Sequence, residues 1–200
     1  DATGLTDIED SASPRPATSK SHSVLSPVEF THPGDIDVVP AQPGIYGWWI
    51  RSGSLEIPVA NYQRQDGFEL IYVGISPRKP SAAGRLSKGN IRRRLNQHVN
   101  GNASQSTLRR SLGVLLMEAL DMTLIFRQGR YLWDKEAHLT DWMHDNARIG
   151  YVVDDAPWLV EDELLAQAVL ALNIQGRGND PFAKTLAARR RAARAVARLN

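Results

Sequence analysis

Two short apolar runs in the N-terminal half of the chain predict β-strands. Ile45–Ile50 follows a Pro-Gly pair, and Glu69–Gly74 follows an irregular connection, residues 51–68, that contains glycine, proline and asparagine. A second irregular stretch, Ser76–Gly89, comes after the second run. We therefore expect the two strands to pair as an antiparallel hairpin with a long connection between them.

A helix is predicted from Asn90 to about Val99. Asparagine commonly caps a helix N-terminus, and the apolar residues that follow recur every four positions, which gives one buried stripe. Arg94 and His98 are also four positions apart, so they lie on one face of the helix, beside this stripe. The helix is therefore expected to present a cation and an imidazole together.

Further helices and short strands follow. Helical spacing predicts helices over residues 106–119, 132–146, 158–171 and 181–198, and apolar runs predict strands over residues 122–126 and 149–153. Strands and helices do not alternate strictly, so we predict an α+β fold. Its centre is a small, mostly antiparallel sheet of about three strands that is flanked by helices.

The chain divides into three regions by composition and pattern. Residues 1–26 are rich in Ser, Thr, Pro, Asp and Ala and have no hydrophobic period, so we predict a disordered N-terminal arm. Residues 27–176 are predicted to form the folded domain. Residues 177–200 are predicted to form a basic C-terminal helix, begun by a first-turn proline, that is packed on the domain or appended to it.

Basic and acidic residues are segregated along the chain, although the formal net charge is only +2. The stretch from Leu70 to Met117 has no Asp or Glu, and the stretch from Pro181 onward has six basic residues and no acid. Such segregation predicts a positive face for a polyanion, for which we expect nucleic acid, whereas an ordinary solvated surface is the alternative. The basic residues of the first stretch are Arg78, Lys79, Arg85, Lys88, Arg92, Arg93, Arg94, Arg109 and Arg110.

The composition excludes several other kinds of site. Because the chain has no cysteine, it has no disulfide and no thiolate metal site. No Gly-rich nucleotide-binding loop is present, so we expect no nucleotide cofactor. No apolar run approaches the roughly 18–20 residues of a membrane span, and the first residues show no signal-peptide pattern. We therefore expect a cytoplasmic protein that does not bind membranes.

The strand and helix segments together resemble the motifs of the GIY-YIG nuclease family. The matching residues are Gly44-Ile45-Tyr46 for the first motif, Tyr72-Val73-Gly74 for the second, and Arg94 and His98 for the family's helix pattern. The resemblance implies an endonuclease that depends on a divalent metal ion and hydrolyses DNA phosphodiester bonds by in-line attack of water. Any one of these residues alone has an ordinary structural explanation, and it is their joint occurrence, in order, that supports the family.

The resemblance implies a role for each of these side chains. Tyr46 would be assigned to the attacking water, with Tyr72 supporting it by hydrogen bonding. Arg94 would grip the scissile phosphate, which suits a planar, always charged guanidinium that can bind two oxygens at once. His98 would be a base or a partner of the catalytic groups. The phenol is a poor base at its usual pKa of about 10, so nearby positive charge would have to activate it.

The resemblance also implies a site for Mg²⁺ or Mn²⁺ at Glu161, which opens a predicted helix. Leu164, Leu165 and Asn173 reproduce the spacing that follows the family's metal-binding glutamate. A carboxylate suits this cation, since Mg²⁺ prefers oxygen ligands and usually takes one or two carboxylates from a protein. Asn173 would hydrogen-bond back toward the strands. The residues expected to support the site structurally are Gly44, Gly74 and Asn173.

Two connections are longer than is usual in the family. Residues 47–71, 25 in number, separate the two tyrosines, and 19 residues separate Gly74 from Arg94. We expect the second connection to follow the phosphate backbone, because it contains Arg78, Lys79, Arg85 and Lys88. Two other functions stay open, a nucleic-acid-binding module that does not cleave and a nuclease or toxin directed at RNA. The oligomeric state and the preferred substrate are not predicted.

Overall fold

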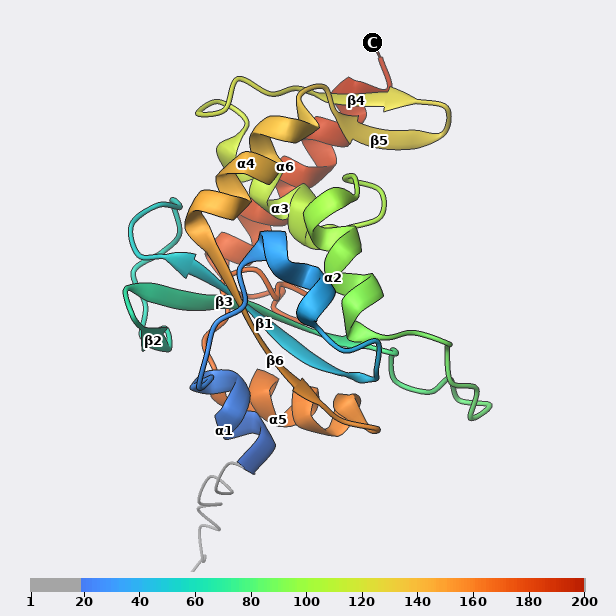
Figure 1. The fold of residues 1–200 in the computed structure, drawn as a ribbon. Coiled ribbons are helices and arrows are strands. Elements are labelled where there is room, and N and C mark those ends of the chain that lie inside the picture. The colour runs from blue at the N-terminus through green and yellow to red at the C-terminus, as the bar shows by residue number, and fades with distance from the viewer. Residues whose placement is uncertain (1–18, 200) are drawn as a thin grey trace, which may run out of the picture.

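The centre of the protein is an antiparallel sheet whose strands lie in the order β2-β3-β1-β6. The computed structural model, which describes residues 19–199, gives the bounds as β1 (Gly44–Arg51), β2 (Arg64–Gln65), β3 (Phe68–Ser76) and β6 (Ala147–Val153). The longer strands form the expected sheet, and the two-residue strand β2 adds an edge that was not predicted. The predicted α+β fold is confirmed (Figure 1).

The strand register places the two tyrosines of interest on one face of the sheet. Tyr46 lies opposite Gly74, and Tyr72 lies opposite Trp48. Residues that are directly opposite on neighbouring strands point to the same face, as do residues two apart along one strand. A bulge shifts the register between Trp48 and Trp49, beyond the tyrosines. The bulge therefore does not change the direction of the two tyrosines, and both phenols lie on the same face of the sheet.

Helices cover both faces of the sheet (Figure 1). One face carries the layer of α2 (Ile91–Asn100), α3 (Thr107–Leu116) and α4 (Glu136–Asn146), and the other carries α1 (Ser19–Leu25) and α5 (Pro157–Gln167). A 3₁₀ segment, η1 (Pro33–Val38), lies beside α2. Within residues 19–199, none of the helices combines the length and the apolar character needed to traverse a lipid bilayer.

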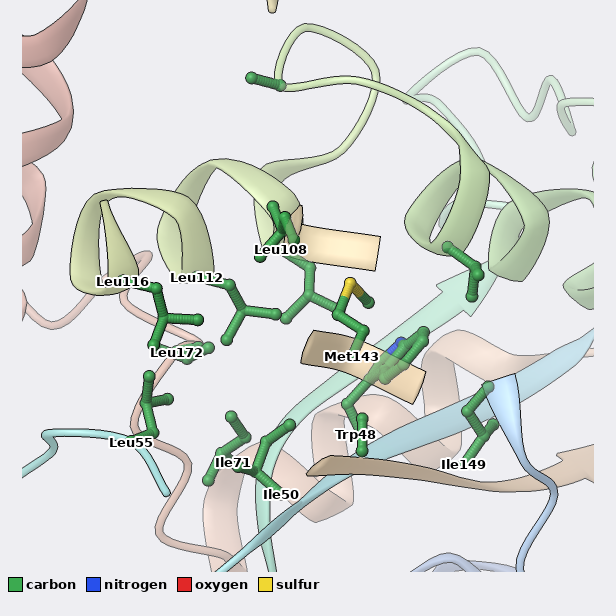
Figure 2. Packing of buried hydrophobic residues seen from close by; sticks show 14 of the residues in the cluster. Trp48, Ile50, Leu55, Ile71, Leu108, Leu112, Leu116, Met143, Ile149 and Leu172 are labelled. Carbon is green, nitrogen blue, oxygen red and sulfur yellow. The ribbon is translucent and has the colours of Figure 1, made fainter. Parts of the chain in front are cut away.

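The larger hydrophobic core lies between the sheet and the layer of α2, α3 and α4. Trp48 and Ile50 of β1 and Ile71 of β3 meet Leu112 of α3 and Met143 of α4 in this core (Figure 2). Each of these side chains is at most 2% exposed. Full burial of one such side chain contributes about 1.5–3 kcal/mol relative to its exposure, so this core fixes the helical layer over the tyrosine face.

A separate hairpin of β4 (Leu124–Arg127) and β5 (Arg130–Trp133) replaces the start of the helix predicted over residues 132–146. Gln128 and Gly129 connect the two strands with φ angles of 51° and 75°. Two successive residues in this left-handed region form the turn that matches the twist of a two-residue hairpin. Trp133, expected in a helix, therefore pairs with β4, and α4 begins only after it.

Part of the predicted disordered arm is folded. Within residues 1–26, α1 packs against the sheet and α5, and its Val24 is fully buried. Lys20 Nζ also forms an ion pair of 2.5 Å with Asp154. Composition alone gave no sign of these contacts, because Asp154, β6 and α5 lie more than a hundred residues away in the sequence. The remainder of the predicted arm, residues 1–18, lies outside the described residues.

The basic C-terminal helix, α6 (Pro181–Ala197), begins at its proline as predicted. The Asp180 side chain caps it by accepting the backbone N–H of Ala183 at 2.8 Å. The helix packs against α3 and β4, and Arg189 Nη2 donates to the carbonyl of Val114 at 2.6 Å. Helix α6 is therefore joined to the helical layer by both apolar and polar contacts.

Candidate active site

Tyr46, near the start of β1, lies at the centre of the candidate site. Its side chain is 1% exposed, and its hydroxyl oxygen lies 2.8 Å from Nε2 of His98. The ring packs on Gly74, where an added Cβ would come within 2.4 Å of the hydroxyl oxygen. The ring of Tyr72 stands edge-on to the same imidazole, with centroids 6.0 Å apart. The glycine of the second strand segment therefore makes room for the tyrosine of the first.

His98 connects Tyr46 to Ser106, the N-cap residue of α3. Ser106 Oγ lies 2.6 Å from His98 Nδ1 and accepts the backbone N–H of Arg109 at 3.0 Å. No other described residue accepts from the Ser106 hydroxyl, so that hydroxyl donates to Nδ1. In a neutral imidazole the proton then resides on Nε2, which donates to the Tyr46 oxygen. The O–H of Tyr46 does not donate to His98 in this arrangement, so it is available to donate to another acceptor.

Burial keeps the phenols and the imidazole of this cluster uncharged. It raises the pKa of Tyr46 well above the usual value, and Tyr72 adds to this effect, while the charge and hydrogen bond of Arg94 oppose it. Burial likewise raises the pKa of Tyr72, with Arg94 opposing. It lowers the pKa of His98, and the charges of Arg94 and Arg109 lower it further. Near neutral pH, the cluster therefore contains neutral hydrogen-bonding groups beside one guanidinium.

That guanidinium is Arg94. Its Nη1 donates to Gln97 Oε1 at 3.0 Å and to the carbonyl of Gln105 at 3.1 Å, which fixes it at the junction of α2 and α3. Among the ion pairs of the described residues, none involves Arg94. A guanidinium that is fixed in place and has no carboxylate partner suits an incoming phosphate.

Glu161 is the carboxylate whose charge acts on both phenols, although its helix, α5, packs on the face of the sheet opposite α2. It lies in the second turn of α5, not at the helix start as predicted, because the helix begins at Pro157. Burial and then the adjacent Asp162 raise the pKa of Glu161 to about 7, while Lys79 opposes the rise. The charge of Glu161 in turn contributes to the raised pKa of Tyr46 and of the second tyrosine. The carboxylate is therefore within electrostatic reach of both phenols.

The resemblance of the motifs implies a divalent cation beside Glu161. Within the part of the chain that the structure describes, no group of three or more His, Cys, Asp or Glu side chains is placed so that it could bind a metal ion. Mg²⁺ does not need one, since it binds through one or two carboxylates and completes its shell with water and substrate phosphate. The half-buried Glu161 fits such a site, because a bound cation favours the ionised carboxylate that burial disfavours.

Asn173 ties the segment that follows α5 to the sheet. The N–H of Val73 donates to Asn173 Oδ1, and Asn173 Nδ2 donates to the carbonyl of Val73, both at 2.9 Å. The N–H of Leu172 donates to the carbonyl of Ile71, also at 2.9 Å. Because this segment runs along β3, α5 ends at Gln167 and not at residue 171 as predicted. These bonds hold the strand that carries the second tyrosine.

The basic residues expected to bind nucleic acid differ in their surroundings. The exposed ones, on the loop of residues 77–89 and on α2, are Arg78, Lys79, Arg85, Lys88 and Arg93. Lys79 forms a 3.2 Å ion pair with Asp162, between two largely exposed side chains. Arg92 donates from Nε to the carbonyl of Val39, and Arg110 donates to the carbonyl of Ala103. The two last arginines therefore also have structural contacts.

The prediction that Arg109 binds nucleic acid is wrong. Its side chain is fully buried, and its Nη2 lies 2.6 Å from Glu136 Oε2 on α4. Its Nη1 donates to the carbonyls of His98 and Val99 at the end of α2. The residue joins three helices from the inside. Local spacing gave no sign of this, because its acidic partner lies on another helix.

Sequence reasoning missed Ser106 and Arg190 of α6. Ser106 was expected only to start a helix, and nothing in its neighbourhood indicated the contact with His98. Burial raises the pKa of Tyr72, and the charge of Arg190 on α6 is among those that oppose this rise. The available signal was the position of Arg190 four residues after Leu186, on the apolar side of the predicted helix.

Comparison with known proteins gives one match. A protein-family model described as the GIY-YIG catalytic domain matches residues 44–192, which is most of the chain. The matched range contains both tyrosine segments, α2, Glu161 and Asn173, and it extends into α6. No curated protein and no solved structure matches the chain. The family resemblance expected from the motifs is confirmed.

Proposed function

Because the chain belongs to the GIY-YIG nuclease family, we propose that it is an endonuclease that hydrolyses DNA phosphodiester bonds with the help of a divalent metal ion. The observation that supports this most is that the buried Tyr46 hydroxyl lies 2.8 Å from Nε2 of His98, on the helix that also carries Arg94. Hydrolysis needs an aligned water, a cation for the phosphoryl oxygens and stabilisation of the leaving oxygen.

Tyr46 aligns the water in this proposal. Burial keeps its phenol protonated, and the Nε2–H of His98 occupies one lone pair of its oxygen, so the phenol O–H is directed to a water in the site. Tyr72 supports the water from the same face of the sheet. Arg94 binds the phosphoryl oxygens. A Mg²⁺ or Mn²⁺ ion held by Glu161 would neutralise the charge that develops on the leaving oxygen.

The test is a panel of DNA substrates incubated with and without Mg²⁺ or Mn²⁺. Wild type is expected to cleave only with metal, and Glu161→Ala and Arg94→Ala should each abolish cleavage while the fold and most of the DNA affinity remain. Glu118→Ala and Arg130→Ala are matched controls, since both residues are exposed and neither is expected to bind nucleic acid. Cleavage at the wild-type rate by either site variant removes that residue from the mechanism.

The same panel separates the two other candidate functions. Parallel RNA substrates identify an RNA-directed nuclease if RNA is cleaved and DNA is not. Tight binding of DNA without cleavage under every metal condition indicates a binding module on a nuclease scaffold. A buried phenol whose ionisation responds to both a guanidinium and a carboxylate favours cleavage over such a module.

We also propose that the loop of residues 77–89 follows the phosphate backbone. Its Arg78 acts on the ionisation of Tyr72, and its Lys79 acts on that of Glu161, so one end of the loop adjoins the site. Neutral substitutions at Arg78, Lys79, Arg85 and Lys88 together should flatten the salt dependence of DNA binding. An unaltered slope of affinity against salt excludes the loop from the interface.

A further inference from the structure

Helix α6 places an arginine on its packed face. Leu186 and Ala197, at most 1% exposed, lie four residues before and seven residues after Arg190. At about 3.6 residues per turn, these positions form one stripe along the helix. Lys184 and Arg191 fall on the opposite face and are exposed. Arg190 therefore stands where α6 otherwise presents apolar side chains to the protein.

Two more arginines lie near Arg190, namely Arg194, four residues further along α6, and Arg110 on α3, the helix against which α6 packs. Burial lowers the pKa of Arg190, and the charges of Arg110 on α3 and Arg194 on α6 lower it further. Burial and Arg194 also lower the pKa of Arg110. The charge of Arg190 reaches Tyr72 of the candidate active site. We term these three residues, Arg110, Arg190 and Arg194, the arginine track.

The arginine track has no carboxylate partner in residues 19–199, where every ion pair involves other side chains. Like charges at half-buried positions disfavour one another, so the protein alone leaves this charge uncompensated. The neighbouring Arg109 shows the contrast, since it pairs with Glu136. The track arginines thus keep a net positive charge that an anion would compensate.

Arg110 is already oriented for a ligand. Its Nε and Nη2 donate to the single carbonyl oxygen of Ala103 at 2.9 and 2.7 Å, which fixes the plane of the guanidinium. No described residue accepts from its Nη1. A guanidinium with a fixed plane and free N–H groups loses little side-chain entropy when it binds a phosphate.

We propose that the arginine track binds the phosphodiester backbone of the substrate strand next to the phosphate that is cleaved. This inference rests on the proposed function, because a nucleic acid substrate is what brings phosphates to this place. Helix α6 runs from the sheet toward the β4–β5 hairpin (Figure 1). Arg194 lies one turn beyond Arg190 along it. A strand that leaves the active site along α6 therefore meets successive cations.

The test is binding of a fluorescently labelled DNA duplex, measured by anisotropy over a range of salt concentrations without divalent metal. The double variant Arg190→Gln/Arg194→Gln is compared with wild type. The control is Lys184→Gln/Arg191→Gln, which removes the same charge from the exposed face of the same helix. The slope of log affinity against log salt should fall by about one unit per track arginine, and by much less in the control.

The outcomes separate this inference from the proposed function. Equal slopes for wild type and the track variant overturn the inference alone. Equal losses in the two double variants also overturn it, because they indicate general charge attraction and not a defined site. Failure of the wild-type protein to bind any nucleic acid overturns the inference and the proposed function together.

Thermal unfolding of the same variants without DNA distinguishes a ligand site from a structural role. Arg190→Gln removes a half-buried charge from a cluster of like charges, so the unfolding temperature of the free protein should be unchanged or higher. An unfolding temperature for the track variant well below that of the control contradicts the proposal, because it assigns the arginines to the packing of α6.

Discussion

The hydroxyl oxygen of Tyr46 and Nε2 of His98 lie 2.8 Å apart inside the protein, although 52 residues separate them along the chain. We assign the imidazole as the donor in this pair and the phenol oxygen as the acceptor, because the Ser106 hydroxyl beside the other ring nitrogen has no other acceptor among the described residues. The direction of the Tyr46 O–H is therefore decided by a serine on a third structural element.

Substitution of Ser106 tests this chain of hydrogen bonds. Ser106→Ala should release the His98 tautomer, seen as a change in the imidazole ¹⁵N shifts, and should lower the cleavage rate about tenfold or more. It should also destabilise the protein by about 0.5–2 kcal/mol through the lost helix cap. Ser106→Thr keeps both hydrogen bonds and should restore the ¹⁵N shifts and the rate.

A second variant that loses only a helix cap separates the effect of Ser106→Ala on the His98 tautomer from its effect on stability. Asp180→Ala removes the cap of α6 and should produce a comparable loss of stability with unaltered His98 signals. Unchanged ¹⁵N shifts in Ser106→Ala contradict the tautomer assignment.

Gly74 is expected to tolerate no side chain. The Cβ of Gly74→Ala would lie 2.4 Å from the Tyr46 hydroxyl oxygen, so the phenol must move. A displacement of about 1 Å at reacting groups costs about 100-fold in rate, whereas overpacking costs about 1–3 kcal/mol of stability. Gly178→Ala is the control, because an added Cβ there meets nothing within 4 Å. Wild-type kinetics in Gly74→Ala contradict the close packing of the phenol.

Arg109 is expected to affect stability and not DNA affinity. Arg109→Ala leaves Glu136 and the carbonyls of His98 and Val99 without their donor, so the free energy of unfolding should fall by about 3–5 kcal/mol. Urea denaturation measures this loss. Arg93→Ala, at an exposed position of α2, should change it by less than about 0.5 kcal/mol. A stable Arg109→Ala variant with weakened DNA binding restores the discarded prediction.

His98 is expected to make stability depend on pH. Burial lowers the pKa of His98, so the folded protein keeps it neutral in a range below about pH 6.5 in which the unfolded chain binds a proton. The free energy of unfolding should therefore rise with pH through that range, by at most about 1.4 kcal/mol per pH unit, and level off above it. Denaturation of wild type and His98→Gln between about pH 5 and 8 measures the contribution. Identical pH slopes contradict it.

The parts of the fold that were predictable are those with a strong local signal. The Asn90 cap and the four-residue apolar repeat located α2, and compact apolar runs located β1, β3 and β6. The hairpin of β4 and β5 was missed because Leu132 and Trp133 also fit the helical spacing of the residues after them. Only the left-handed backbone at Gln128 and Gly129 shows that a turn precedes them.

The candidate site was predictable only as far as motif residues mark it. Tyr46, Tyr72 and Arg94 were found because they stand at fixed places within recognisable segments. The exposure of a charged side chain depends on which side chains lie near it in the folded protein. The sequence shows Arg109 and Arg190 only as two of many basic residues, so their burial was not predicted. Ser106 was missed for the same reason, since its contact with His98 joins two helices.

The hydrogen bonds of Leu172 and Asn173 have a consequence for how the protein behaves in solution. Strand β3 pairs with β2 at Phe68 and Glu69 only, so the rest of its outer margin would offer unpaired backbone groups to any extended peptide. The backbone of Leu172 and the amide of Asn173 occupy those groups at Ile71 and Val73. Along this stretch the sheet margin therefore has fewer free backbone groups with which to template the addition of a strand from a second molecule.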